Sequence, residues 1–96
     1  MATLMKIDGT KIEVFPKNKR NGFTLKEVYE IICCSMVEIV GTMNDGRLMF
    51  VDEEGKLKKG WGALINPQAT ELYRVFFGVR DVIVGNALLV TDEEFQ

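Results

Sequence analysis

The stretch of residues 66–90, NPQATELYRVFFGVRDVIVGNALLV, constrains the fold of this chain more than any other. Asn66 fits the cap of a helix, and Pro67 fits its first position, where a missing backbone N–H costs nothing. Gly78 supplies a left-handed stop for the same helix. We therefore predict a helix between these residues, followed by a long apolar strand over residues 82–90.

One polar residue interrupts the predicted strand. Asn86 stands in an otherwise apolar run, and an amide is costly to bury without a hydrogen-bond partner. Three partners are open for it: the backbone, a neighbouring chain or a ligand. Within the predicted helix, the apolar residues recur at helical spacing, which assigns Phe76 to the core. Phe77 then faces elsewhere, either exposed for stacking or packed on a partner chain.

Two hairpins are predicted before this stretch. Asp8-Gly9 lies between two extended runs, which indicates a two-residue turn between strands at about residues 3–7 and 11–15. A second hairpin has its strands at residues 36–43 and 47–52. Both hairpins make antiparallel pairs.

A helix is predicted between the two hairpins. Thr24 and Glu27 form a capping box, and Phe23 and Val28 form the hydrophobic staple that accompanies such a start. The inner stripe of this helix begins at Leu25.

The resulting order, ββαββαβ, predicts a single α+β domain over residues 3–91 with an acidic tail at 92–96. We expect a mainly antiparallel five-stranded sheet with two helices that cover one of its faces. Such a sheet keeps open edges and an open face. Because self-association often closes them, we expect a homo-oligomer, a dimer or higher.

Composition excludes several classes of function. The net charge of −2 argues against a nucleic-acid polymer as partner. The absence of histidine removes Ser–His and Cys–His catalysis and histidine-based metal sites. No catalytic motif appears, so we expect no enzyme activity, no cofactor and no metal.

The cysteines and the hydropathy indicate a location. Cys33 and Cys34 are adjacent, which strains a disulfide between them and leaves too few ligands for zinc. Buried, reduced thiols of a cytosolic protein are the expected state. The sequence contains neither a signal peptide nor a run of ~20 apolar residues, so a soluble protein of the cytoplasm is expected.

Charged residues gather in three places. The consecutive carboxylates of residues 52–54 are expected to diverge in a solvated turn. Two basic loops lie beside aromatic residues, and their cations are Lys17, Lys19 and Arg20 in the first and Lys56, Lys58 and Lys59 in the second. Cations beside rings suit nucleotide binding, and two solvated loops are the alternative.

A candidate site gathers around the second helix. Phe77, Arg80 and Asn86 lie within ten positions and would combine stacking, charge and amide recognition. That combination suits adenine or ribose-phosphate ligands. Arg47 and Arg74 are further arginines that can fork onto phosphate.

Five phrases of the sequence resemble a known family. They are KIDGTKIEV, NGFTLKEVYEII, VEIVGTMNDGRLMFVDEEGKLK, NPQATELY and DVIVGNALLV. In this order they resemble small proteins of bacteriophages and mobile elements that form a domain family of unknown function. The ββαββαβ layout resembles the phage Thoeris anti-defence sponge proteins of the first described type.

The second resemblance implies a function. Sponge proteins bind a cyclic ADP-ribose signal of the host without cleaving it, and some hold cyclic oligonucleotides such as those of CBASS defence. An aromatic residue and an asparagine help to form their pocket, which implies Phe76 or Phe77 with Asn86 here. The expected ligand-binding residues are Phe76, Phe77, Asn86, Arg80, Arg20 and Arg47.

The alternative is a protein-interaction module that inhibits a host enzyme. It predicts an exposed apolar patch and no small-molecule pocket, whereas the sponge predicts a nucleotide-shaped pocket without turnover. An enzyme would need a catalytic carboxylate or cysteine site, and the sequence contains no motif for one.

Overall fold

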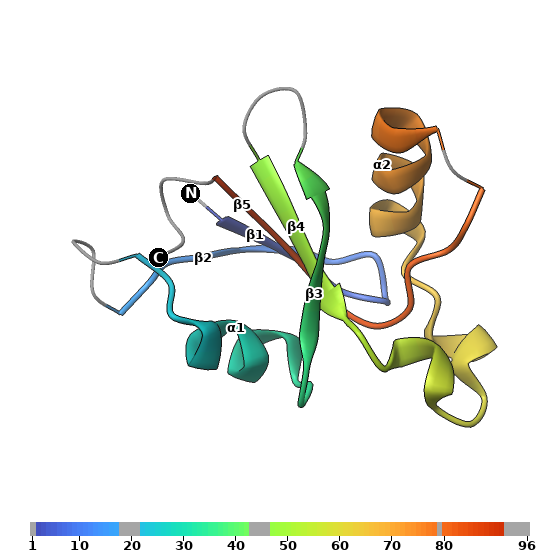
Figure 1. Ribbon diagram of the computed structural model, residues 1–96, viewed down its shortest axis with the longest axis horizontal. Coiled ribbons are helices and arrows are strands. Elements are labelled where there is room, and N and C mark those ends of the chain that lie inside the picture. The colour runs from blue at the N-terminus through green and yellow to red at the C-terminus, as the bar shows by residue number, and fades with distance from the viewer. Residues whose placement is uncertain (1, 18–21, 43–46, 79, 92–96) are drawn as a thin grey trace.

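In the computed structural model, the chain folds around one antiparallel sheet with the strand order β2-β1-β5-β4-β3 (Figure 1). The structure describes residues 2–17, 22–42, 47–78 and 80–91. The strands are β1 (Ala2–Met5), β2 (Lys11–Val14), β3 (Val37–Thr42), β4 (Arg47–Asp52) and β5 (Ala87–Thr91). The helices are α1 (Leu25–Ile32) and α2 (Pro67–Phe77), with short 3-10 turns η1 (Gly55–Leu57) and η2 (Trp61–Leu64) between β4 and α2.

The predicted α+β class, the order ββαββαβ and the five-stranded sheet with two helices are confirmed. Arg20, the turn at 44–46 and the tail at 92–96 lie outside the described residues. In the part of the chain that the structure describes, no helix is long and apolar enough to cross a membrane.

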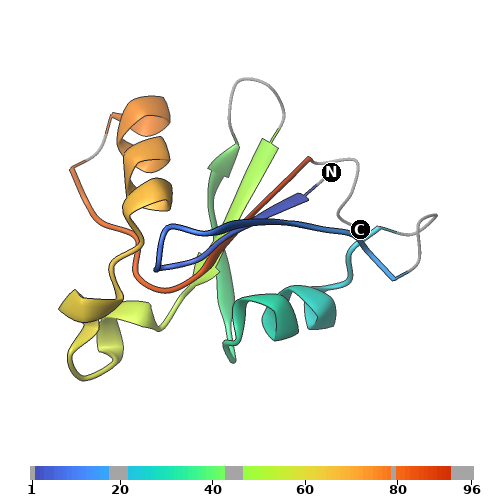
Figure 2. The same ribbon diagram turned by 180° about the vertical axis from the view of Figure 1, so that it is seen from behind.

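The two helices lie on opposite faces of the sheet, not on one face as expected (Figures 1 and 2). Leu88 and Val90 of β5 pack in one cluster with Val28 of α1. The alternate residue Leu89 packs in a second cluster with Ala69 of α2. Successive strand side chains point to opposite faces, so each helix covers its own face. All of residues 87–90 are buried for this reason.

The first hairpin turns with one residue more than predicted. Lys6 N donates to Thr10 O over 2.9 Å, and Gly9 N donates to Lys6 O over 3.0 Å. The loop therefore has three residues, 7–9. Gly9 has φ +91°, the left-handed position that three-residue hairpin loops require.

Helix α1 begins with the predicted capping box. Thr24 Oγ1 accepts from Glu27 N at 3.2 Å, and Glu27 Oε1 accepts from Thr24 N at 3.2 Å. Phe23 and Val28 are fully buried in the same cluster, as the hydrophobic staple predicted. The expectation for Leu25 was wrong, because its side chain is 45% exposed. The buried stripe of α1 is narrower and runs through Val28 and Ile32.

Helix α2 has the predicted cap and stop, but the strand after it is shorter than predicted. Asn66 caps the helix, Pro67 opens it and Gly78 ends it with φ +66°. The predicted strand over 82–90 was wrong in its first half, where Val84 makes only an isolated bridge to Ile65. Gly85 follows with φ +87°, outside the extended region, so β5 starts at Ala87.

Candidate functional site

The structure brings together two of the predicted site residues, Arg47 and Phe76. Arg47 opens β4, and Phe76 lies in the last turn of α2. The guanidinium carbon of Arg47 lies 5.8 Å from the centroid of the Phe76 ring. This is the distance range of a cation–π contact, which stabilises by about 0.5–1 kcal/mol at an exposed site.

The assignment of Phe76 to the core was wrong. Ala69 is buried, and Leu72 and Tyr73 pack against the same cluster. One turn later the helix has left that cluster, and Phe76 is 39% exposed beside Arg47. The helical period was correct, but it does not tell where along a helix the sheet stops covering it. The side chain of Phe77 lies outside what the structure describes.

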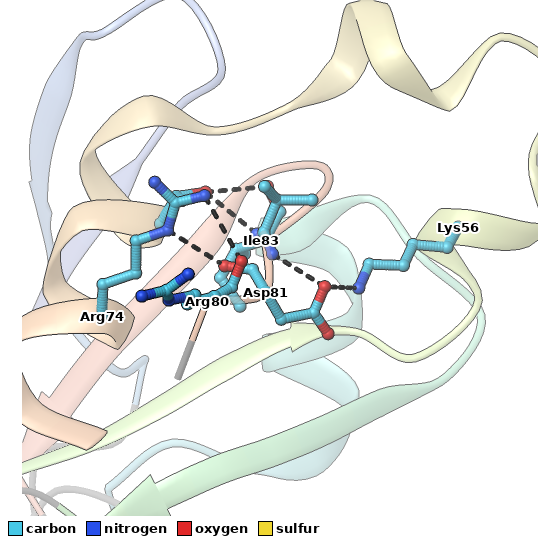
Figure 3. Close-up of polar contacts among 7 residues, drawn as sticks. Lys56, Arg74, Arg80, Asp81 and Ile83 are labelled. Atoms are coloured by element: carbon cyan, nitrogen blue, oxygen red, sulfur yellow. Dashed lines mark hydrogen bonds and ion pairs between the residues drawn. The ribbon is translucent and has the colours of Figure 1, made fainter. Parts of the chain in front are cut away.

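Arg80 lies exposed in the loop after α2, and Arg74 fixes the path of that loop (Figure 3). Arg74 Nε donates to Asp81 O at 3.4 Å, and its Nη2 donates to Arg80 O at 3.5 Å. Lys56 forms an ion pair with the Asp81 carboxylate. The contact with Lys56 is the main reason that the pKa of Asp81 is lower than its ordinary value, and a hydrogen bond from Val82 N lowers the pKa further. Arg74 thus holds Arg80 near the C-terminal end of α2.

Asn86 lies at a different place. Its Oδ1 accepts a hydrogen bond from Ile7 N at 3.3 Å, so a backbone group supplies the partner that the sequence left open. Asn86 directly precedes β5, whereas Arg47 pairs with Thr91 at the other end of that strand. Five residues of extended chain separate the two ends by roughly 16 Å. The structure therefore does not bring Asn86 together with Arg47.

A second asparagine has a larger role than the sequence indicated. Asn66 is fully buried, and its Oδ1 accepts from Ala69 N at 3.1 Å as the predicted cap. Its Nδ2 also donates to Met5 O at 2.8 Å and to Gly85 O at 3.0 Å. One side chain thus joins the start of α2 to β1 and to the segment before β5. Only the capping half of this role could be predicted from neighbouring residues.

A hollow of about 450 Å³ lies at the C-terminal end of α1. It is lined by Tyr29, Glu30, Cys33, Cys34, Ser35, Asp52, Glu54 and Lys58. Asp52 pairs with Lys58 at 2.8 Å and accepts from Glu54 N at 2.9 Å. The hydrogen bond to Asp52 raises the pKa of Lys58. The prediction of a fully solvated acidic turn was wrong for Asp52, which is buried at the end of β4 and whose charge is offset by Lys58.

The two cysteines differ in exposure. Cys33 is exposed, contrary to the expectation of buried thiols, because it occupies the left-handed C-cap of α1 with φ +64°. Cys34 is half-buried, and both thiols are free. Burial is the main reason that the pKa of Cys34 is raised, and the negative charge of Asp52 raises it further. A thiol with a raised pKa is a poor nucleophile at neutral pH.

Two cations of the second basic loop are less available to a ligand than the sequence suggested. In the second loop, Lys56 and Lys58 each have a carboxylate partner. In the first loop, the backbone N–H of Lys17 donates to Glu27 Oε2 at 3.0 Å, and Lys19 and Arg20 lie outside the described residues. Among the residues with described positions, no group of three or more acidic or cysteine side chains could hold a metal ion.

Comparison with known proteins gives a family. The family model described as "Domain of unknown function (DUF3846)" matches residues 2–96. No curated protein and no solved structure matches the chain. The expected resemblance to a domain family of unknown function is confirmed, and the chain belongs to that family.

Proposed function

We propose that this DUF3846 protein is a phage anti-defence protein that sequesters a cyclic nucleotide immune signal without cleaving it. The ligand class is a cyclic ADP-ribose isomer or a cyclic oligonucleotide. The observation that carries the proposal is the contact between Arg47 and the exposed ring of Phe76. A base stacked on such a ring gains about 1–3 kcal/mol, and a guanidinium beside it suits phosphate.

The local charge supports an anionic ligand. The chain has a net charge of −2, yet three arginines lie around the C-terminal half of α2: Arg47, Arg74 and Arg80. Asp81, which follows Arg80, is paired with Lys56. The three guanidinium groups are the feature of this end of α2 that suits a nucleotide phosphate.

The ligand would need a second chain to enclose it. Arg47 and Phe76 line none of the hollows of about 310, 330 and 450 Å³. Within one chain, a ligand at these two residues would therefore lie on an open surface. Tight binding of a small molecule requires that most of its surface be buried. The proposal therefore places the site where two copies of the chain meet, in keeping with the homo-oligomer that the sequence predicts.

The resemblance supports the choice of ligand. The phrases quoted for the resemblance run from Lys6 to Val90, and the resemblance to the sponge proteins rests on the ββαββαβ order of the sequence. Asn86, which the resemblance implied as a pocket residue, has a backbone partner within the chain. We therefore leave Asn86 out of the proposed ligand contacts, which are Phe76, Arg47 and Arg80.

Calorimetric titration with a panel of signalling nucleotides tests this proposal. The panel contains cyclic ADP-ribose isomers and cyclic di- and trinucleotides. We expect saturable binding of one class and recovery of the intact ligand after the protein is denatured. Recovery of a cleaved product would contradict sequestration. An absence of binding across the panel would contradict the ligand class and favour the alternative, a module that inhibits a host enzyme by docking on it.

A further inference from the structure

Strand β2 is a regular open edge of the sheet. Among the described residues it pairs with β1 alone, in a ladder without irregularity from Ala2–Val14 to Met5–Lys11 (Figure 1). Its side chains Lys11, Ile12 and Glu13 are exposed. An edge of this kind is a template for another strand.

The opposite edge, β3, is less suited to pairing. Its register with β4 shifts between Ile39 and Thr42. A bulge bends and twists a strand, which is one way that proteins protect an edge from further pairing. The described ladder between β2 and β1 has no such shift.

Hydrogen-bond alternation tells which backbone groups of β2 face outward. Lys6 N donates to Thr10 O, so Lys6 and Thr10 form a hydrogen-bonded pair. Hydrogen-bonded and non-hydrogen-bonded pairs alternate along an antiparallel ladder. Ile12 is therefore bonded to β1, while the N–H and C=O groups of Lys11 and Glu13 point away from it.

We propose that two copies of the chain pair through β2, antiparallel, with Ile12 opposite Ile12 of the partner subunit. The outward groups allow three registers with Lys11 and Glu13 as the bonded residues. Two of them place lysine opposite lysine or glutamate opposite glutamate, and like charges directly opposite are destabilising. The third places Lys11 opposite Glu13 of the partner subunit, and Glu13 opposite the partner's Lys11.

This third register satisfies backbone and side chains together. Each of the two lysine–glutamate pairs exchanges two backbone hydrogen bonds. Between them Ile12, which is 41% exposed in the single chain, meets its own copy at a non-hydrogen-bonded position, where side chains lie closest. The arrangement is two-fold symmetric and extends one sheet across both subunits. This contact is separate from the one proposed to enclose the ligand, because β1 and β5 lie between β2 and the strand β4 that carries Arg47, and it does not depend on the proposed ligand.

Sedimentation velocity at increasing protein concentration tests the pairing. We expect a concentration-dependent dimer for the unaltered chain. Lys11→Glu turns both attractive pairs into repulsive ones, so the dimer dissociation constant should rise by roughly tenfold or more. Lys11→Glu combined with Glu13→Lys restores opposite charges and should restore the dimer. Lys59→Glu is the matched control, because it makes the same charge change at an exposed residue outside the sheet.

A second variant tests the backbone directly. Glu13→Pro removes an outward N–H and leaves the ladder to β1 intact, so it should also give a monomer. The pairing is overturned if the unaltered chain stays monomeric up to millimolar concentration. It is also overturned if Lys11→Glu changes the dimer no more than Lys59→Glu does, or if the charge-swapped double variant remains a monomer.

Discussion

The two helices begin with the same chemistry in two different settings. Thr24 caps α1 within an exposed box whose partner, Glu27, lies three residues away. Asn66 caps α2 from a fully buried position and also bonds to Met5 and Gly85, which lie 61 and 19 residues away. The first start depends on its neighbours in sequence, and the second depends on the whole fold.

This difference matters for the proposed site. Phe76 lies at the far end of α2, so its place beside Arg47 depends on how α2 is held. Asn66 holds the other end of that helix against β1 and against the segment before β5. A cap that also joins distant segments should therefore contribute to global stability, whereas an exposed cap should contribute to its own helix.

The largest effect is expected for Asn66→Ala. The change removes a helix cap, which contributes about 1 kcal/mol, and the two hydrogen bonds of the Asn66 amide nitrogen, which contribute about 1 kcal/mol each. We expect the free energy of unfolding to fall by about 3 kcal/mol in urea titrations followed by circular dichroism. A loss of only ~1 kcal/mol would show that Asn66 acts as an ordinary cap, and the comparison would fail.

Asn66→Asp sharpens this test. Aspartate keeps an oxygen that can cap Ala69 N but loses the amide that donates to Met5 O and Gly85 O. We expect a loss at least as large as that of Asn66→Ala, because a carboxylate would be buried against two carbonyl oxygens. Stability equal to that of the unaltered chain would contradict the role of the amide.

A smaller effect is expected for Thr24→Ala. Loss of the exposed cap should lower the free energy of unfolding by about 1 kcal/mol, as for other N-cap threonines. The same urea titration measures it, and Thr24→Ser is the matched control because serine keeps the hydroxyl. A loss as large as that of Asn66→Ala would contradict the distinction between the two helix starts.

The smallest effect concerns pH. The backbone N–H of Lys17 and the Thr24 contacts lower the pKa of Glu27 below its ordinary value of 4.5. A lowered pKa in the folded state means that the carboxylate stabilises the fold above the unfolded pKa. That contribution is lost as the pH falls through the folded pKa.

Urea midpoints of the unaltered chain and of Glu27→Gln, compared from neutral pH downward, measure this contribution. Glutamine can still accept the hydrogen bonds of the capping box, so the difference between the two proteins measures the contribution of the Glu27 charge alone. The advantage of the unaltered chain should shrink as the pH falls through the folded pKa of Glu27. A difference that is independent of pH would mean that the charge of Glu27 adds nothing to the box.

Local signals in the sequence were sufficient for much of the fold. The box at Thr24 and the Asn66–Gly78 frame of α2 involve residues within one turn of each helix end, so they could be predicted directly. The placement of the helices on opposite faces was missed, although the uninterrupted apolar run at 87–90 carries its signal. A strand that is buried along every residue must be covered on both faces.

The candidate site was only partly predictable. Arg47 and Phe76 were both singled out, but their contact joins residues 29 positions apart through the packing of α2 on the sheet. The second bonds of Asn66 likewise depend on segments that meet only in the folded chain. Asn86 was recognised as an amide in need of a partner, and only the tertiary structure could identify that partner as Ile7 N.

The most direct measurement compares two exposed phenylalanines by calorimetric titration with the nucleotide that binds best. Phe76→Leu removes the ring beside Arg47, and Phe15→Leu removes a ring that is 60% exposed and directly follows β2, at the end of that strand away from the hairpin turn. We expect Phe76→Leu to weaken binding by roughly tenfold or more, since stacking contributes about 1–3 kcal/mol per base, while Phe15→Leu binds as the unaltered chain does. Equal affinity of both variants and the unaltered chain would contradict the assignment of the site to Phe76 and Arg47.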